Sequence, residues 1–458
     1  MTMQEIKAAG VSQQDVVARL ERLPLSSWQI KMRIIVGTAT FFDGFDALSI
    51  AYILPAIIPP WHMKPADIGW LISMGYVGQL IGALVGGWLA ERYGRRPVII
   101  ASILWFGLFS IACAFAWSYE SLLTLRTLQG LGLGAEVPVA ATYISELAKA
   151  RGRGRFVLLF ELVFPIGILM AALLGRWIVP HLGWQYMFYI GGLPALLALF
   201  MMRLMPESPR WLASRDQLGK ADAALRDIEA QVERASGAKL PPPQAISIAP
   251  SKTVIDWRDL FRGIYLQRTL VLWVCWFATY LANYGLTTWL PSVYQQVFKL
   301  PLEQALSYGL ISSAVGLFGS LLCALFIDKV GRKIWFTCAF FGSAIALLTL
   351  WFIGPTTPER VLICTTLSFM CISTLSLAMY LYTSELYPTR MRAFGSGTAT
   401  AWLRIASIIG PVTVGTIVGA GGLGTVFLLF GTVVLIAAFI VVAFGVETKG
   451  KVLEDVSP

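Results

Sequence analysis

The stretch Leu89–Arg96, which reads LAERYGRR, recurs in closely similar form as FIDKVGRK at Phe326–Lys333. A second pair follows in the same order and at nearly the same spacing, because SELAKARGR at Ser145–Arg153 matches SELYPTRMR at Ser384–Arg392. Matched pairs at one spacing indicate an internal duplication, which must be recognised before any fold is assigned. The chain is therefore predicted to consist of two related halves.

The sequence around these repeated stretches is strongly apolar. Of its 458 residues, 57% are hydrophobic and 14% are charged, whereas a soluble domain is usually about half apolar and about a quarter charged. Twelve apolar runs are each long enough to cross a bilayer as a helix, and the alternating pattern of barrel strands is absent. The predicted spans are 31–58, 67–90, 97–117, 121–147, 155–179, 184–204, 268–298, 304–327, 333–354, 360–387, 393–419 and 423–446.

The predicted fold class is an all-α polytopic membrane protein with about twelve transmembrane helices in two six-helix repeats. Such parallel repeats are related by an axis along the membrane normal. The polar segment between the halves contains LPPPQ at Leu240–Gln244 and is predicted to be a linker. The expected divisions are an N-terminal segment at 1–30, a first bundle at 31–204, a linker at 205–267, a second bundle at 268–446 and a tail at 447–458.

The formal charge of +10 is placed unevenly along the chain. Lysine and arginine gather at every second connection between spans, and this enrichment marks the cytoplasmic side of a membrane protein. Both termini and the linker are therefore expected in the cytoplasm, and the charge gives no support for nucleic-acid binding. The clustered residues are Arg92, Arg95, Arg96, Lys149, Arg151, Arg153, Arg155, Lys329, Arg332, Lys333, Arg390 and Arg392.

The two repeated loops have the composition of a conformational latch. Glycine permits the positive φ of a tight turn, and an acid at a helix end can pair with an arginine or with a neighbouring helix N-terminus. An ordinary positively charged loop is the simpler alternative, but two copies in register favour the latch. The residues assigned to gating are Glu91, Arg92, Gly94, Arg95, Arg126, Glu146, Arg153, Asp328, Arg332, Glu385 and Arg392.

The first span contains two carboxylates, Asp43 and Asp46, in the sequence FFDGFD. Residues three apart share a helix face, and ionising both in a buried position is costly, which suits a proton-coupling site. Packing through hydrogen bonds to backbone or tyrosines is the alternative. The equivalent places of the second half hold Thr279 and Ala282, so an acid is not required there by the fold.

The fourth span combines small residues with two charges. Gly130 and Gly134 lie on a face where helices can approach closely. Arg126 stands near the start of the span, where it either faces a cavity or reaches the membrane surface. Glu136 lies farther from a helix end and is assigned, with the two acids of the first span, to proton coupling.

The remaining predicted binding residues are spread over three spans. Arg404 lies in an apolar helix without a neighbouring acid in sequence, so it must find an anion elsewhere. That anion is either an internal acid such as Glu161 or the carboxylate of a substrate, which the planar guanidinium suits. Asn283, Tyr284 and Trp289 offer aromatic and polar groups for a small-molecule pocket, although tryptophan also collects at membrane interfaces.

These motifs together resemble the major facilitator superfamily over essentially the whole chain. PESPRWL at Pro206–Leu212 is similar to a motif of sugar and organic-ion porters. The stretches Gly130–Glu146, Asn283–Tyr294 and Leu381–Pro411 resemble bacterial niacin transporters, which are related to synaptic vesicle glycoprotein 2 and to organic-ion carriers. The DGFD quartet resembles aromatic acid/proton symporters. One group implies niacin and the other benzoate-type acids, and both are small flat rings bearing a carboxylate.

The resemblance implies a secondary active transporter of the inner (plasma) membrane that takes up an aromatic carboxylate, nicotinate first, with protons and by alternating access. A monomer without cofactor is expected. A sugar or organic-cation porter is the alternative within transport, and a non-transporting receptor or scaffold is the alternative of another class. An enzyme is disfavoured, because the chain has two histidines and no nucleotide-binding loop or nucleophile–base set.

Overall fold

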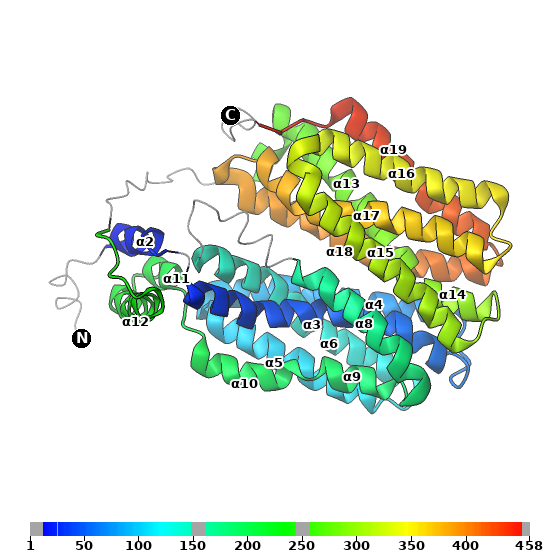
Figure 1. Ribbon diagram of the computed structural model, residues 1–458, viewed down its shortest axis with the longest axis horizontal. Coiled ribbons are helices and arrows are strands. Elements are labelled where there is room, and N and C mark those ends of the chain that lie inside the picture. Colours follow the sequence, from blue (N-terminus) through cyan, green and yellow to red (C-terminus); the bar gives the residue numbers. More distant parts are fainter. Residues whose placement is uncertain (1–11, 25, 148–161, 244–256, 451–458) are drawn as a thin grey trace.

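The computed structural model describes residues 12–24, 26–147, 162–243 and 257–450, and within these residues the chain is helical and has no strand (Figure 1). The helices are α2 (Gln13–Glu21), α3 (Ser27–Ile57), α4 (Pro65–Tyr93), α5 (Arg95–Ala114), α6 (Tyr119–Leu147), α8 (Val163–His181), α9 (Gln185–Gly191), α10 (Pro194–Leu204), α11 (Pro209–Ser214), α12 (Leu218–Ser236), the 3₁₀ turn η1 (Trp257–Phe261), α13 (Ile264–Thr287), α14 (Leu290–Gln296), α15 (Leu302–Val330), α16 (Arg332–Ile353), α17 (Pro358–Leu386), α18 (Thr389–Gly419) and α19 (Leu423–Phe444).

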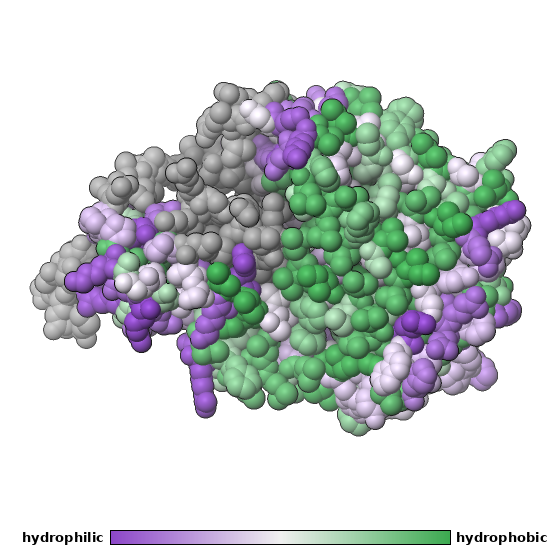
Figure 2. All heavy atoms as spheres, in the orientation of Figure 1, coloured by the Kyte–Doolittle hydropathy of each residue, from purple (hydrophilic) through white to green (hydrophobic). Residues whose placement is uncertain are grey.

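Eleven segments of the described chain are helical, long and apolar enough to cross a membrane. Two of them consist of consecutive helices, α9 with α10 and α13 with α14. The charged helix α6, with 29 residues, lies among them and packs against α4 and α5. A broad zone of hydrophobic side chains covers the middle of the molecule, and hydrophilic side chains gather toward both ends (Figure 2). The predicted all-α membrane fold is therefore confirmed.

The helices of each half pack on one another as a bundle, α3 to α10 in one and α13 to α19 in the other (Figure 1). In the first bundle, glycines bring α4 and α6 into close contact. A side chain added at Gly78 would collide with the carbonyl of Thr127, and one added at Gly134 would collide with the backbone of Gln79. This close approach is the role that the sequence predicts for the glycines of the fourth span.

The two bundles touch along several helix pairs, of which α4 with α18 is the most extensive. Ser73 donates a hydrogen bond to the carbonyl of Ile408 at 2.7 Å. The rings of Tyr76 and Tyr284 lie 4.9 Å apart between their centroids. Ser73 and Tyr76 lie in the first half of α4, which begins at Pro65. The two bundles therefore meet between the middle of α4 and the connection that leads into it from α3.

Outside the spans, α2 packs against α12 through apolar residues and ion pairs. Arg19 contacts Asp222 and Glu229, each at 2.6 Å, and Arg22 contacts Glu229 at 2.7 Å. The buried side chains of α2 and α12 belong to one hydrophobic cluster, to which Leu20 contributes. The N-terminal segment and the linker therefore form one small helical unit at the end of the first bundle.

We expect an Arg19→Ala substitution to release α2 from α12. Hydrogen bonds to charged groups contribute roughly 1.5–3 kcal/mol, so opening of α2 should become more frequent by about tenfold or more. Hydrogen–deuterium exchange of the Gln13–Glu21 amides measures this opening. Arg226→Ala is the matched control, because exposed Arg226 also pairs with Asp222, at 2.7 Å, but from the surface. If the Gln13–Glu21 amides exchange at the same rate in Arg19→Ala and in Arg226→Ala, apolar contacts alone hold α2.

The pH dependence of this contact follows from Glu229. Burial raises the pKa of Glu229, but its hydrogen bonds with Arg19 and Arg22 outweigh burial and lower that pKa below its ordinary value of 4.5. A lowered folded-state pKa stabilises the contact above the ordinary value, and this stabilisation is lost as pH falls through the lowered pKa. Docking of α2 should therefore be constant around neutral pH and weaken only in acid.

Candidate functional site

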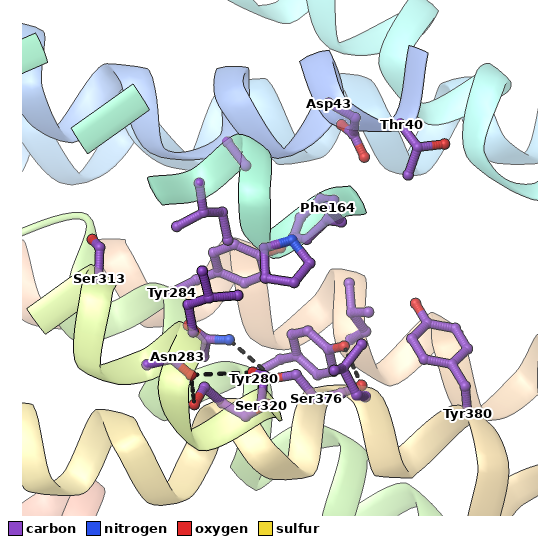
Figure 3. Close-up of a pocket in the computed structure, with 18 of the residues that line it drawn as sticks. Thr40, Asp43, Phe164, Tyr280, Asn283, Tyr284, Ser313, Ser320, Ser376 and Tyr380 are labelled. Carbon is purple, nitrogen blue, oxygen red and sulfur yellow. Dashed lines mark hydrogen bonds between the residues drawn. The ribbon is translucent and has the colours of Figure 1, made fainter. Parts of the chain in front are cut away.

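A cavity lies between the two bundles and is lined by side chains of both. With the space that opens from it, its atom-free volume is about 950 Å³, which is within the range of small-molecule sites, roughly 300–1,000 Å³. Figure 3 shows Thr40 and Asp43 on one side of this cavity and Tyr280, Ser376 and Tyr380 on the other. The helices that contribute lining residues are α3, α4, α6, α8, α13, α15, α17 and α18.

Arg404 of α18 is the cation among the described residues that line the cavity. Its guanidinium donates a hydrogen bond to the amide oxygen of Gln79 on α4, so one contact orients the arginine and also joins the two bundles. The amide is neutral and leaves the positive charge uncompensated by that contact. An arginine held in this way can accept the carboxylate of a ligand, which it binds through two parallel hydrogen bonds.

Asp43 of α3 is the acid among the described lining residues. It is 7% exposed, and no described residue forms a hydrogen bond with its carboxylate. Arg404 acts on it electrostatically from the opposite bundle, and Asp46 acts on it from the same helix. A buried acid that faces a cavity and an arginine is well placed to gain and lose a proton.

Asp46 lies in a different environment, although it is one helical turn away. Its carboxylate accepts hydrogen bonds from Arg126 at 2.8 and 2.9 Å and from Gln129 at 2.8 Å. The side chains of Asp46 and Arg126 are 2% and 6% exposed. The sequence left open whether Arg126 faces a cavity or reaches the membrane surface. In the structure it is buried in an ion pair that joins α3 to α6, and neither partner lines the cavity.

Two aromatic rings of the cavity wall, Tyr280 and Tyr284, come from α13. They stack along the helix, with ring centroids 5.8 Å apart, and Trp276 stacks on Tyr280 from outside the lining, at 5.5 Å. Tyr284 also packs against Tyr76 of the first bundle. Such a wall suits the face of a flat ring.

The other predicted site residues occupy separate places. Asn283 lines the cavity beside Tyr284. Trp289 does not line it, because its indole nitrogen donates to the carbonyl of Pro411 at 3.1 Å within the second bundle. Glu136 is buried in α6, next to the lining residue Val137, and its role in proton coupling stays a prediction. Glu161 lies outside the described residues.

The first cluster of predicted gating residues consists of Glu91, Arg95 and Glu146. It is called the first latch here, and its role in gating stays a prediction. Arg95 contacts Glu91 at 2.8 Å and Glu146 at 3.2 Å, and Gly94 turns the chain before it with φ of 110°. The contact joins the ends of α4, α5 and α6. Of the other predicted gating residues of this half, Arg92 lies outside the latch, 5.5 Å from the ring of Trp88.

The second latch consists of Asp328, Arg332 and Glu385 and repeats the first. Arg332 contacts both acids at 2.7 Å, and Gly331 has φ of 104°. Among the described residues, the contacts of each latch stay within one bundle. Of the remaining predicted gating residues, Arg153 lies outside the described residues, and the side chain of Arg392 in α18 is likewise not described.

Comparison with known proteins decides the family. Residues 36–458 match the family described as sugar (and other) transporter. The chain belongs to this family. It is a multi-pass membrane transporter, as the sequence predicts, and it has the fold of a proton:xylose symporter of the major facilitator superfamily.

Relatives of this transporter match over most of its length. A niacin transporter of Acinetobacter baylyi is 35% identical over 446 residues and covers 96% of this chain and 99% of its own. A 4-hydroxybenzoate transporter of Pseudomonas aeruginosa is 31% identical and covers 90% of this chain and 91% of its own. A D-xylose-proton symporter structure has a TM-score of 0.71 at 19% identity, covering 92% of this chain and 99% of its own, which shows the shared fold.

Each latch of the transporter is completed by an acid that sequence reasoning missed. Glu207 accepts hydrogen bonds from the backbone nitrogens of Arg95 at 3.0 Å and Arg96 at 3.3 Å. Glu447 does the same for Arg332 at 2.9 Å and Lys333 at 3.1 Å. The signal was present, since both acids precede a hydroxyl residue just after the last span of their half.

The two acids differ electrostatically despite their equivalent places. Burial raises the pKa of Glu207 above its ordinary value, and hydrogen bonds from backbone amides offset this only in part. For Glu447, burial also raises the pKa, but backbone hydrogen bonds from Lys449, Arg332 and their neighbours outweigh it and hold the pKa low. Glu207 of the first latch is therefore protonated more readily than Glu447 of the second.

Several cavity residues of the transporter were also missed. Tyr280 could have been found, because it stands one helical turn before Tyr284 on the same face. Gln79 was visible as an amide in an apolar helix. Ser376 carries no signal in the sequence, since serine is common in membrane helices and bonds to its own backbone.

Proposed function

We propose that this transporter takes up a small aromatic carboxylate together with a proton by alternating access, and that nicotinate is the first substrate to test. It works as a monomer in the bacterial plasma membrane with both termini in the cytoplasm. The observation that carries the proposal is the pairing, in one cavity, of Arg404 with an aromatic wall and with Asp43. The similarity to niacin and 4-hydroxybenzoate transporters supports the same substrate class.

The charges of the cavity explain the coupling. With Asp43 ionised and the cavity empty, Arg404 has an acid to balance its charge. A substrate carboxylate bound at Arg404 adds a second negative charge, which raises the cost of keeping Asp43 ionised. Protonation of Asp43 therefore favours substrate binding, and substrate binding favours protonation, because the two events are linked. Asp46 keeps its partner Arg126 throughout and takes no part in this exchange.

Alternating access requires the bundles to separate where they now meet. The contact between Arg404 and Gln79 crosses the two bundles inside the cavity. A substrate carboxylate that takes over the donors of Arg404 competes with Gln79 for them. Binding can thus loosen one cross-bundle contact, while each latch keeps the helix ends of its own bundle together.

The test is uptake of radiolabelled nicotinate into proteoliposomes. One proton moving with one monovalent anion is electroneutral, so an imposed pH gradient should drive accumulation, about tenfold per pH unit at equilibrium, and an imposed membrane potential should not. Protein-free vesicles correct for passive entry of the protonated acid. Benzoate should compete, whereas nicotinamide and glucose should not. Competition by glucose, or uptake driven by potential alone, would contradict the proposal.

A further inference from the structure

We propose that Asn283 and Ser376 form a second, uncharged recognition point that selects aromatic carboxylates bearing a hydrogen-bonding group on the ring. The group is a ring nitrogen or a ring hydroxyl, and it lies on the part of the ring away from the carboxylate. This inference rests on the proposed function and assigns the residues that set specificity within it.

The contacts of Asn283 leave most of its amide available. The amide nitrogen donates one hydrogen bond, to the hydroxyl of Ser376 at 3.2 Å. No described residue bonds the amide oxygen or the second N–H, and an asparagine side chain offers two donors and an acceptor. Because Asn283 is half-buried in the wall of the cavity, both groups are at the surface that a ligand touches.

Ser376 holds that amide in place. Its hydroxyl accepts from Asn283 and donates to the carbonyl of Ile372 at 3.3 Å. Tyr280 donates to the backbone carbonyl of Ser376 at 3.4 Å. The serine is therefore anchored from its own helix, α17, and from α13, so the orientation of Asn283 is set before a ligand arrives.

The position of this pair suits the end of a ring opposite its carboxylate. Figure 3 shows Asn283, Ser376 and Tyr280 together, whereas Asp43 lies across the cavity, with Phe164 between the two sides. Arg404 donates a hydrogen bond to Gln79 of the first bundle and acts electrostatically on Asp43. A flat ring whose carboxylate meets Arg404 and whose face meets Tyr284 thus presents its remaining edge to Asn283.

The chemistry of the pair accepts two kinds of ring. The free N–H of Asn283 can donate to a pyridine-type nitrogen, and its oxygen can accept from a ring hydroxyl. An unsubstituted ring satisfies neither group and leaves both without a partner when it fills the cavity. The relatives carry names that fit this chemistry, since niacin has a ring nitrogen and 4-hydroxybenzoate has a ring hydroxyl.

The experiment compares competitors in proteoliposomes that take up radiolabelled nicotinate. The half-inhibitory concentrations of 4-hydroxybenzoate, unlabelled nicotinate and benzoate are measured for the wild type, Asn283→Ala and Ser376→Ala. In the wild type, the two substituted rings should compete about tenfold better than benzoate, which corresponds to one hydrogen bond at a half-exposed amide. In Asn283→Ala the ratio should fall to about one, because the substituted rings lose their hydrogen bond and benzoate no longer leaves the amide unsatisfied.

The controls separate this inference from the proposed function. Ser320→Ala is the matched control, because Ser320 also lines the cavity but its hydroxyl donates to backbone carbonyls of Gly316 and Ser373; it should keep the tenfold ratio. An unaltered ratio in Asn283→Ala, or no preference in the wild type, overturns the inference and leaves carboxylate transport standing. If Asn283→Ala is not recovered folded, an unaltered ratio in Ser376→Ala overturns it. A wild type that takes up no carboxylate overturns both.

Discussion

An Arg404→Ala variant is expected to take up an aromatic carboxylate roughly a hundredfold more slowly than the wild type, close to the level of protein-free vesicles. Truncating one partner of a desolvated charge pair costs roughly 2–5 kcal/mol, and Arg404 is the cation of the described cavity lining. Initial rates in proteoliposomes measure the effect, normalised to the amount of monodisperse protein recovered after reconstitution.

Two further variants separate charge, geometry and position at this arginine. Arg404→Lys keeps the charge but loses the planar pair of donors, so a loss of about tenfold is expected. Gln79→Ala keeps the guanidinium but removes the amide that holds it, so KM should rise while the maximal rate changes less. Uptake by folded Arg404→Ala at the wild-type rate would remove the anion-binding role from this residue.

Much of the fold follows from local properties of the sequence. Helix length and apolar composition fix where each span lies, because an unpaired backbone cannot cross a bilayer. The local part of each latch could also be predicted. Gly94 and Gly331 are needed for positive φ, and each loop arginine pairs with an acid four residues before it. Its second acid lies 51 or 53 residues away, at the end of another span. Duplication then indicates that the same geometry occurs twice.

The partners of buried charges could not be predicted in this way. Asp46 and Arg126 are 80 residues apart, and their contact depends on how α3 and α6 are rotated about their own axes. A membrane helix that is apolar on all sides gives no amphipathic face from which to derive that rotation. The sequence therefore placed Asp46 with Asp43 as proton-coupling acids and Arg126 among the gating residues, whereas the structure joins Asp46 to Arg126.

Trp289 illustrates a second limit. Tryptophan suits a ligand pocket, a membrane interface or a helix contact equally well, because its ring is apolar and its nitrogen needs one acceptor. That acceptor is the carbonyl of Pro411, which is 122 residues away in the sequence and reaches the ring only when α18 packs against it. Tyr284, one turn earlier, faces the cavity instead. Composition alone does not distinguish these two environments.

An Asp43→Asn variant is expected to lose proton-driven accumulation while keeping exchange of substrate across the membrane. The amide cannot release a proton, so Arg404 stays ready for a carboxylate at every pH and net uptake no longer follows the pH gradient. Counterflow, in which unlabelled substrate inside drives entry of labelled substrate, needs no proton and should stay within about threefold of the wild type. Uptake of Asp43→Asn that still accumulates with the pH gradient would move the coupling acid elsewhere, with Glu136 the next to test.

Asp46→Asn is the control that the structure provides, since it removes a carboxylate from the same face of α3. Breaking a buried ion pair from one side costs roughly 3–5 kcal/mol, so this variant should lose thermal stability and yield of folded protein. The protein that does fold should keep its response to the pH gradient. Replacing both partners, as Asp46→Leu with Arg126→Met, should restore most of the stability, because it leaves no unpaired charge behind. A normal melting temperature for Asp46→Asn, together with a flat pH response, would exchange the roles of the two aspartates.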